Sequence, residues 1–153
     1  MKCLVAFYSR TGITKKVAEA ISKILKCDSE EIFDTQNRAG GVGYFKSGRD
    51  STMKKLTELK KIKNNPASYD TVIIGTPIWA WNVSTPIRTY LSQNKFKKVA
   101  FFCTMGGSGG KKAFKEMEKL CKEKPIAVLE LKTAEVADNK HLQKVREFAK
   151  KII

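Results

Sequence analysis

The chain has 153 residues, of which 42% are hydrophobic, so it is long enough for one domain with a buried core. Its 30 lysines and arginines outnumber 15 acidic residues and give a formal net charge of +15, which favours anionic partners. No apolar run approaches the roughly 20 residues of a membrane helix, and the first residues do not read as a signal peptide, so we expect a cytoplasmic protein with no membrane partner.

The distribution of cysteine, histidine and lysine argues against two further classes of protein. The four cysteines include no C-x-x-C pair and the chain has one histidine, so we predict no metal site. The lysines follow every predicted helix instead of forming one stripe with aromatic residues, which predicts a solvated basic surface and no specific nucleic-acid partner. His141 lies in the last predicted helix, and we interpret it as a surface residue.

Strand and helix patterns alternate along the first half of the chain. An apolar run predicts a strand over residues 2–8, and a helical pattern follows over 14–26. A short, half-polar strand over 30–34 is expected near a sheet edge. The glycine-rich stretch 35–50 looks irregular, and 51–63 has the apolar spacing of a helix.

The second half continues the same alternation. A β-branched run predicts a strand over 71–75 that is buried on both faces, and Thr85-Pro86 opens a helix as its N-cap and first-turn pair. A strand over 98–103, a helix ending at Cys121, a strand over 126–131 and a closing helix complete the chain. Five strands separated by helices predict an α/β fold, a doubly wound parallel sheet with helices on both faces, in a single domain over 1–153.

The turn after the first strand carries three hydroxyl groups and one glycine. It reads Ser9-Arg10-Thr11-Gly12-Ile13-Thr14 and directly precedes the first predicted helix. Free amides and the dipole at a helix N-terminus attract an anion, and a glycine lets the backbone approach it closely. The turn matches neither a P-loop nor a dinucleotide fingerprint. By itself it leaves two interpretations open, a phosphate site or a simple helix cap.

Two more loops of marked composition follow strand ends, and loops at the carboxyl ends of parallel strands converge. The first, after strand 71–75, is Thr76-Pro77-Ile78-Trp79-Ala80-Trp81-Asn82. Its tryptophans either form a stacking wall for a flat ring or plug the end of the core. The second, after strand 98–103, is Thr104-Met105-Gly106-Gly107-Ser108-Gly109-Gly110, whose bare backbone can bond the edge of a heterocycle.

Together the three loops resemble those of the flavodoxin family, and the resemblance extends along essentially the whole chain. The family's phosphate loop, S/T-x-T-G-x-T, is matched at every defined position. The resemblance implies FMN as cofactor and a short-chain sheet of order 2-1-3-4-5. It implies phosphate contacts from Ser9, Arg10, Thr11, Gly12, Ile13 and Thr14, ring contacts from Thr76, Pro77, Ile78, Trp79 and Ala80 with Trp79 stacked, and contacts to the pyrimidine edge from Thr104, Met105, Gly106 and Gly107.

The chain departs from the family pattern at two points. Electron carriers of the family are usually acidic around the flavin, whereas neither ring loop here contains a carboxylate, so we expect the reduced anion to be stabilised. Many carriers also have glycine where this chain has Ala80, in a peptide that turns to positive φ when the flavin holds one electron. Alanine disfavours that conformation, which shifts some weight towards two-electron chemistry.

The resemblance therefore implies an FMN-binding electron-transfer protein with an acidic redox partner, either ferredoxin-like or a reductase. The flavin carries the redox chemistry, so no catalytic side chain is expected. An NAD(P)H-dependent FMN or quinone reductase of the same fold is the alternative, and a non-redox module that binds nucleic acid or protein is the third reading. The segment 38–45 either approaches the cofactor or packs Tyr44 and Phe45 onto the sheet.

Overall fold

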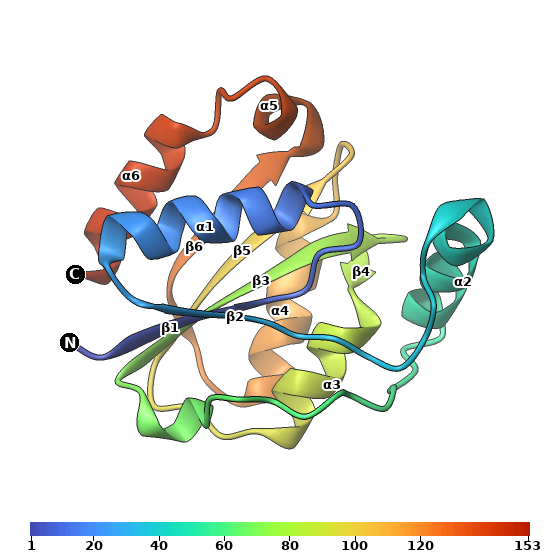
Figure 1. Ribbon diagram of the computed structural model, residues 1–153, viewed down its shortest axis with the longest axis horizontal. Helices are drawn as coiled ribbons and strands as arrows, with labels where there is room; N and C mark the ends of the chain where they lie inside the picture. Colours follow the sequence, from blue (N-terminus) through green and yellow to red (C-terminus); the bar gives the residue numbers. More distant parts are fainter.

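The computed structural model describes residues 1–153 and has a parallel sheet at its centre (Figure 1). The main strands are β1 (Cys3–Phe7), β2 (Asp28–Glu31), β3 (Thr71–Trp79), β5 (Val99–Met105) and β6 (Pro125–Lys132). They lie in the order β2-β1-β3-β5-β6. The short β4 (Asn82–Val83) pairs antiparallel with the end of β3 as a sixth strand. Without β4 the order is the predicted 2-1-3-4-5, and β2 is an edge strand as expected.

Helices cover both faces of this sheet. Figure 1 shows α1 (Ile13–Leu25), α5 (Thr133–Ala137) and α6 (Leu142–Ile152) on one face. The opposite face carries α3 (Thr85–Gln93) and α4 (Gly110–Cys121), and the short helix η1 (Pro66–Ser68) precedes β3. The remaining helix, α2 (Gly40–Thr52), stands beyond the carboxyl ends of the strands. No helix combines the length and the apolar character that crossing a membrane requires.

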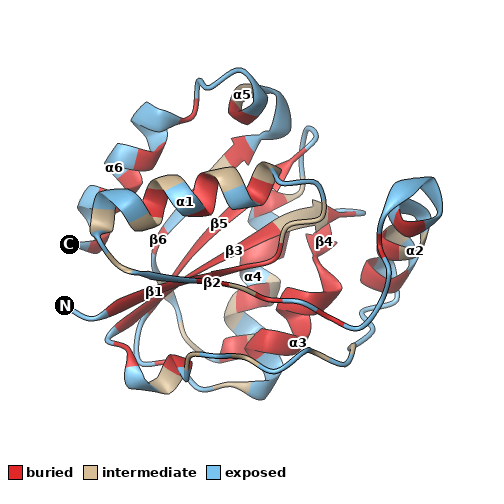
Figure 2. Cartoon of the chain, in the orientation of Figure 1, coloured by how far each residue is buried: buried red, intermediate tan, exposed pale blue.

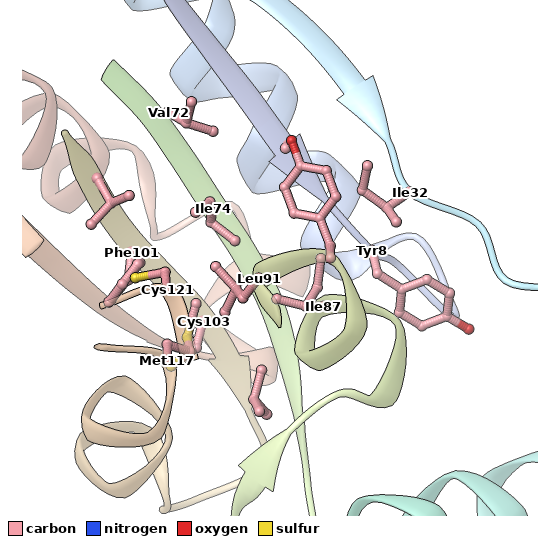
Figure 3. Close-up of a cluster of buried hydrophobic side chains, with 14 of the residues drawn as sticks. Tyr8, Ile32, Val72, Ile74, Ile87, Leu91, Phe101, Cys103, Met117 and Cys121 are labelled. Atoms are coloured by element: carbon pink, nitrogen blue, oxygen red, sulfur yellow. The ribbon is translucent and has the colours of Figure 1, made fainter. Parts of the chain in front are cut away.

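The core consists of two hydrophobic layers, one on each face of the sheet. β1 and β5 are buried along their whole length, as are the first six residues of β3 (Figure 2), which explains their continuous apolar runs. Figure 3 shows the layer beneath α3 and α4, where Ile74, Ile87 and Phe101 pack together. Val17, Ile21 and the buried face of α6 form the other layer. Both layers hold the loops at the carboxyl ends of the strands in fixed positions.

The segment 35–63 differs from prediction, because a helix lies where an irregular stretch was expected and an extended chain lies where a helix was expected. Helix α2 begins at Gly40, inside the glycine-rich stretch, and ends at Thr52. Beyond it the chain runs extended, and Leu59 forms an isolated antiparallel bridge with Asp34. Gly43 permits the helix, because a Cβ there would collide with the backbone of Arg38. This local contact of glycine with the preceding backbone leaves no apolar periodicity in the sequence.

Smaller differences concern element ends. β2 begins two residues earlier than predicted, and β3 continues to Trp79 because its last residues pair first with β5 and then with β4. The short α5 was not predicted, and Ser84, not Thr85, occupies the N-cap position of α3.

His141 is not on the surface as predicted, because its side chain is only 1% exposed at the start of α6. Burial lowers the pKa of its imidazole from the ordinary value of 6.5, and the positive charge of Lys16 lowers it further. As the pH falls, a base whose pKa is lower in the folded chain takes up its proton at a higher pH in the unfolded chain than in the folded chain, which favours unfolding. Its contribution to stability is therefore complete above about pH 6.5 and is lost as the pH falls below that value.

We therefore expect the free energy of unfolding to fall between about pH 7 and pH 5.5, by at most about 1.4 kcal/mol per pH unit from this one proton. The His141→Gln variant has no titrating group at this position, so its stability should depend less on pH over the same interval. Urea unfolding at several pH values measures both slopes. Equal slopes for the two proteins would show that His141 does not titrate differently on folding.

Candidate functional site

The loop between β1 and α1 is folded around the hydroxyl of Ser9. Its Oγ accepts hydrogen bonds from the backbone N–H groups of Gly12 (3.0 Å) and Lys15 (3.2 Å). Gly12 occupies the N-cap position of α1 with φ of 96°, a conformation that favours glycine. The N–H groups of Thr11, Ile13 and Thr14 have no acceptor within the protein. The helix therefore begins with free amide donors, which attract an anion.

A buried hydrogen bond joins the start of α1 to the end of β5. The hydroxyl oxygens of Thr14 and Thr104 are 2.7 Å apart, and either can be the donor. Thr133, which follows β6, donates its hydroxyl to the carbonyl of Met105 (3.2 Å). Three strand ends are thereby tied together, as the topology predicts for the carboxyl edge of a parallel sheet.

These loops enclose a cavity of about 370 Å³, which we call the cofactor cavity. Its volume lies within the usual range of small-molecule sites. It brings together residues from all three predicted loops and two further residues, Tyr44 of α2 and Thr133. The predicted residues that line it are Arg10, Thr11, Ile13, Thr14, Pro77, Ile78, Trp79, Thr104, Met105 and Gly106. No acidic residue lines the cavity, and Arg10 is its one cation.

The other predicted site residues lie outside the wall of this cavity. Ser9 and Gly12 form the turn of the first loop, Gly107 is exposed in the loop after β5, and Ala80 lies in the turn between β3 and β4, away from this cavity. Thr76 is fully buried, and its Oγ accepts a hydrogen bond from the N–H of Ser84 (3.0 Å). Thr76 therefore fixes the start of α3 and does not face the cavity.

The sequence analysis did not predict Thr133 as a site residue. The convergence of loops at the carboxyl ends of parallel strands, which selected the other loops, also applies to Thr133. It is the first residue after the carboxyl end of the last strand, at the same edge of the sheet as the three chosen loops. Its loop contains no glycine cluster or tryptophan, so composition did not mark it.

Trp79 forms part of the aromatic wall but is itself only 6% exposed. The edge of the Tyr8 ring packs against it, with centroids 5.4 Å apart and an interplanar angle of 86°. The guanidinium of Arg38 lies over the Trp79 ring, 5.2 Å from its centroid. Burial raises the pKa of Tyr8 to about 12, and the negative charge of Asp34 adds to this shift, so the phenol stays neutral. The stacking of Trp79 on a flavin stays a prediction.

The two-residue turn between β3 and β4 has both of its residues at positive φ. Ala80 has φ of 49° and Trp81 has φ of 62°, as in a type I′ hairpin turn, although asparagine and glycine usually occupy such positions. The side-chain amide of Asn82 donates to the Ala80 carbonyl (2.8 Å). The Trp81 indole donates to Ser108 Oγ (3.0 Å). Alanine therefore does not keep this turn out of the positive-φ region, contrary to what its residue type suggested.

Trp81 is exposed and does not plug the core. It lies against the loop after β5, where a Cβ on Gly109 would be 2.9 Å from the Trp81 Cα. Gly109 thus allows the backbones of the two loops to approach closely.

Tyr44 and Phe45 of α2 do not pack onto the sheet, which was one of two interpretations of the segment 38–45. Their side chains are 66% and 76% exposed, on the side of α2 that borders the site. The guanidinium of Arg10 lies over the Tyr44 ring, 5.4 Å from its centroid. The segment therefore approaches the site, as the other interpretation held.

Known structures resemble this arrangement. A flavoprotein from Lactobacillus acidophilus NCFM, solved in complex with FMN, has a TM-score of 0.72 and 26% identity, and the match covers 90% of this chain and 97% of that one. A protein from Bacteroides uniformis ATCC 8492 has a TM-score of 0.76 and 25% identity, with 94% and 97% covered. Oxidised flavodoxin 2 from Bacillus cereus, 18% identical with a TM-score of 0.64 and 99% and 97% covered, shares the fold.

No curated protein sequence matches the chain. The sequence profile of a family described as flavodoxin matches residues 2–147, which is nearly the whole chain and includes all three loops. This match agrees with the sheet order and with the position of the cavity at the carboxyl ends of the strands. The chain therefore belongs to the flavodoxin family.

Proposed function

We propose that this protein binds FMN in the cofactor cavity and works as an electron-transfer flavoprotein. The observation that carries the proposal is the set of free amides on Thr11, Ile13 and Thr14, which open into a cavity that also has an aromatic wall. A phosphate satisfies such amides, and a flat ring fits such a wall. The FMN complex of the 26% identical Lactobacillus flavoprotein supports the choice of ligand.

Each part of the cavity has a separate task in this proposal. The amides and hydroxyls at the start of α1 hold the phosphate, with Arg10 as a nearby counter-charge. Residues Pro77 to Trp79 flank the ring, and the backbone from Thr104 to Gly106 bonds its polar edge. Bound FMN supplies the oxidation–reduction chemistry, and the protein supplies binding, orientation and electrostatics.

The conformation of the turn at Ala80 removes the argument from sequence that favoured a two-electron reductase. The argument for two-electron chemistry was that alanine resists positive φ. In the fold, Ala80 already has φ of 49°, and its carbonyl is held by Asn82. The cost of placing alanine at positive φ is therefore already included in the stability of the fold. It is not an additional cost of one-electron reduction.

Titration of the apoprotein with FMN tests the binding proposal. We expect one FMN per chain, and weaker binding of riboflavin, which lacks the phosphate that the free amides would satisfy. Anaerobic stepwise reduction followed by visible absorbance then tests the carrier proposal, and we expect a one-electron-reduced state to accumulate. Failure to take up FMN would refute the whole proposal, and rapid oxidation of NADPH by the loaded protein would favour the reductase.

The charge of the protein also predicts its reduction potential and its partner. Because no carboxylate lines the cavity and the net charge is +15, we expect a higher potential for the fully reduced state than acidic flavodoxins show. At saturating FMN, Arg10→Gln should lower that potential by roughly tens of millivolts, since it removes the cation in the cavity. Arg146→Gln, on an exposed position of α6, should leave the potential unchanged.

Complementary charge further suggests an acidic redox partner, and electron transfer to such a partner should slow steeply as salt is added. Electron transfer that is insensitive to salt, measured by stopped-flow mixing with an acidic ferredoxin, would contradict this part of the proposal.

A further inference from the structure

Helix α2 has an unusual distribution of side chains, with polar residues buried and aromatic residues exposed. Its buried positions are Gly43, Ser47, Asp50 and Ser51. Val42, Tyr44 and Phe45 are among the most exposed hydrophobic residues of the chain. Figure 2 shows the buried positions of α2 on the side facing the rest of the molecule. Amphipathic surface helices normally have the opposite arrangement.

Polar contacts hold α2 in this orientation. Arg38 is ion-paired with Asp50 (3.3 Å) and donates to Ser47 (3.3 Å). The hydroxyl of Ser51 donates to the carbonyl of Val83 (2.9 Å). The aromatic residues therefore do not attach the helix to the protein, and their exposure needs another explanation.

The exposed rings border a crevice between α2 and the end of β3, which we call the α2 crevice. It has a volume of about 300 Å³ and is lined by Tyr44, Phe45, Gly48, Arg49, Ile78, Trp79 and Ala80. This volume is at the lower end of the range for small-molecule sites. The α2 crevice shares Tyr44, Ile78 and Trp79 with the cofactor cavity, so the two are neighbours.

The lining of the α2 crevice indicates the kind of ligand that it fits. Three aromatic rings favour a flat aromatic molecule. No lining residue is acidic, and Arg49, whose side chain is 52% exposed, is the one cation at the crevice. Arg49 lies 3.3 Å from a carboxylate oxygen of Asp50, but Asp50 also pairs with Arg38. One carboxylate is thus shared by two guanidinium groups, which leaves Arg49 able to pair with an anion.

We propose that the α2 crevice binds a small, flat aromatic carboxylate beside the cofactor. The rings of Tyr44 and Phe45 contact the aromatic part of the ligand, and Arg49 pairs with its carboxylate. The inference rests on the proposed function for the position of FMN in the neighbouring cavity. A ligand in the α2 crevice would contact Ile78 and Trp79, which flank the cofactor ring in the proposed function.

The probe is 2-naphthoate, with the uncharged 2-naphthamide as its matched partner. Binding is measured by calorimetry and by NMR shifts of the backbone amides of α2, on the apoprotein and on the FMN-loaded protein. We expect the carboxylate to bind about tenfold more tightly than the amide, because its hydrogen bond to Arg49 is charge-assisted. Arg49→Gln should abolish this preference, and Arg146→Gln, the same change at an exposed position of α6, should retain it.

A second variant blocks the α2 crevice without touching its charges. A Cβ at Gly48 would meet nothing within 4 Å, and Gly48 lines the crevice, so we expect the side chain of Gly48→Leu to extend into it. We expect Gly48→Leu to weaken 2-naphthoate binding by more than about tenfold and to leave FMN uptake intact. Gly41→Leu is the control, because Gly41 is also unobstructed in α2 but does not line the crevice.

The outcomes separate this proposal from the proposed function. Naphthoate binding with this variant pattern in a protein that takes up no FMN would support the crevice and refute the flavoprotein. Displacement of FMN by naphthoate would show that the crevice belongs to the cofactor site and would overturn the proposal. Absence of binding, or equal effects of Gly48→Leu and Gly41→Leu, would overturn it as well.

Discussion

Replacing Thr11 with aspartate is expected to weaken FMN binding by about a thousandfold without destabilising the apoprotein. Thr11 lines the cofactor cavity next to the free amides of α1. A carboxylate about 4 Å from the phosphate would cost about 4 kcal/mol at the effective dielectric constant typical of a protein surface. The same carboxylate lies near the positive end of the α1 dipole, which slightly stabilises the fold. Ligand affinity and stability should therefore change independently.

Quenching of flavin fluorescence measures the affinity, and urea unfolding of the apoprotein measures the stability. The asparagine of Thr11→Asn has nearly the same shape as aspartate but no charge. This variant should therefore bind FMN within about tenfold of the unchanged protein. Riboflavin has no phosphate, and its affinity should be the same for the Thr11→Asp variant and the unchanged protein. If Thr11→Asp weakened riboflavin and FMN equally, the phosphate would not lie at the start of α1.

Replacing Arg38 with methionine is expected to lower the free energy of unfolding by about 3–5 kcal/mol, because it leaves buried carboxylates without their partner. Arg38 is 4% exposed, and its guanidinium lies 2.9 Å from Asp34 and 3.3 Å from Asp50. Both aspartates are also buried. The arginine joins the segment after β2 to α2 and covers the Trp79 ring. Its loss should therefore release α2 as well as destabilise the domain.

Urea unfolding measures the change in stability, and hydrogen exchange of the α2 amides reports the release of the helix. Lys144→Met is the matched control, because it removes an ion pair to Glu135 of similar length (2.8 Å) whose lysine is largely exposed. Such a pair contributes about 1 kcal/mol or less. A loss of less than about 1 kcal/mol for Arg38→Met would show that the buried pairs add nothing beyond their desolvation cost.

The tertiary structure alone determined how the segment 38–63 folds. Helix α2 contains Gly40, Gly41, Gly43 and Gly48, and each interior glycine costs about 1 kcal/mol relative to alanine, so local propensity opposes the helix. Contacts from Arg38, Val83 and the close approach at Gly43 outweigh that cost. The same contacts decide that Tyr44 and Phe45 face outward. Val83 belongs to β4, and the polar contacts of Arg38 with α2 have no apolar periodicity, so no hydrophobic pattern within the segment predicts them.

The burial of His141 has a similar origin. Both α5 and α6 pack against α1 through contacts between residues more than a hundred positions apart, such as the bond from Lys16 Nζ to the carbonyl of Val136 in α5 (3.2 Å). A single histidine in a basic helix gives no sign of that neighbour. Likewise, the positive φ values of Ala80 and Trp81 follow from the pairing of β4 with β3, since the residue types there oppose such a turn.

The resemblance of the loops to the flavodoxin family implied the order of the main strands. The amino-acid sequence by itself determined the α/β class and the convergence of three loops at one edge of the sheet. These features follow from local patterns, because buried parallel strands need continuous apolar runs and the helices that cover them need an apolar stripe. Only the tertiary structure decided which loop residues face the cofactor cavity and that α2 forms the neighbouring crevice. Those outcomes depend on specific side-chain contacts, above all the buried ion pairs of Arg38 with Asp34 and Asp50, whose energies no hydrophobic pattern encodes.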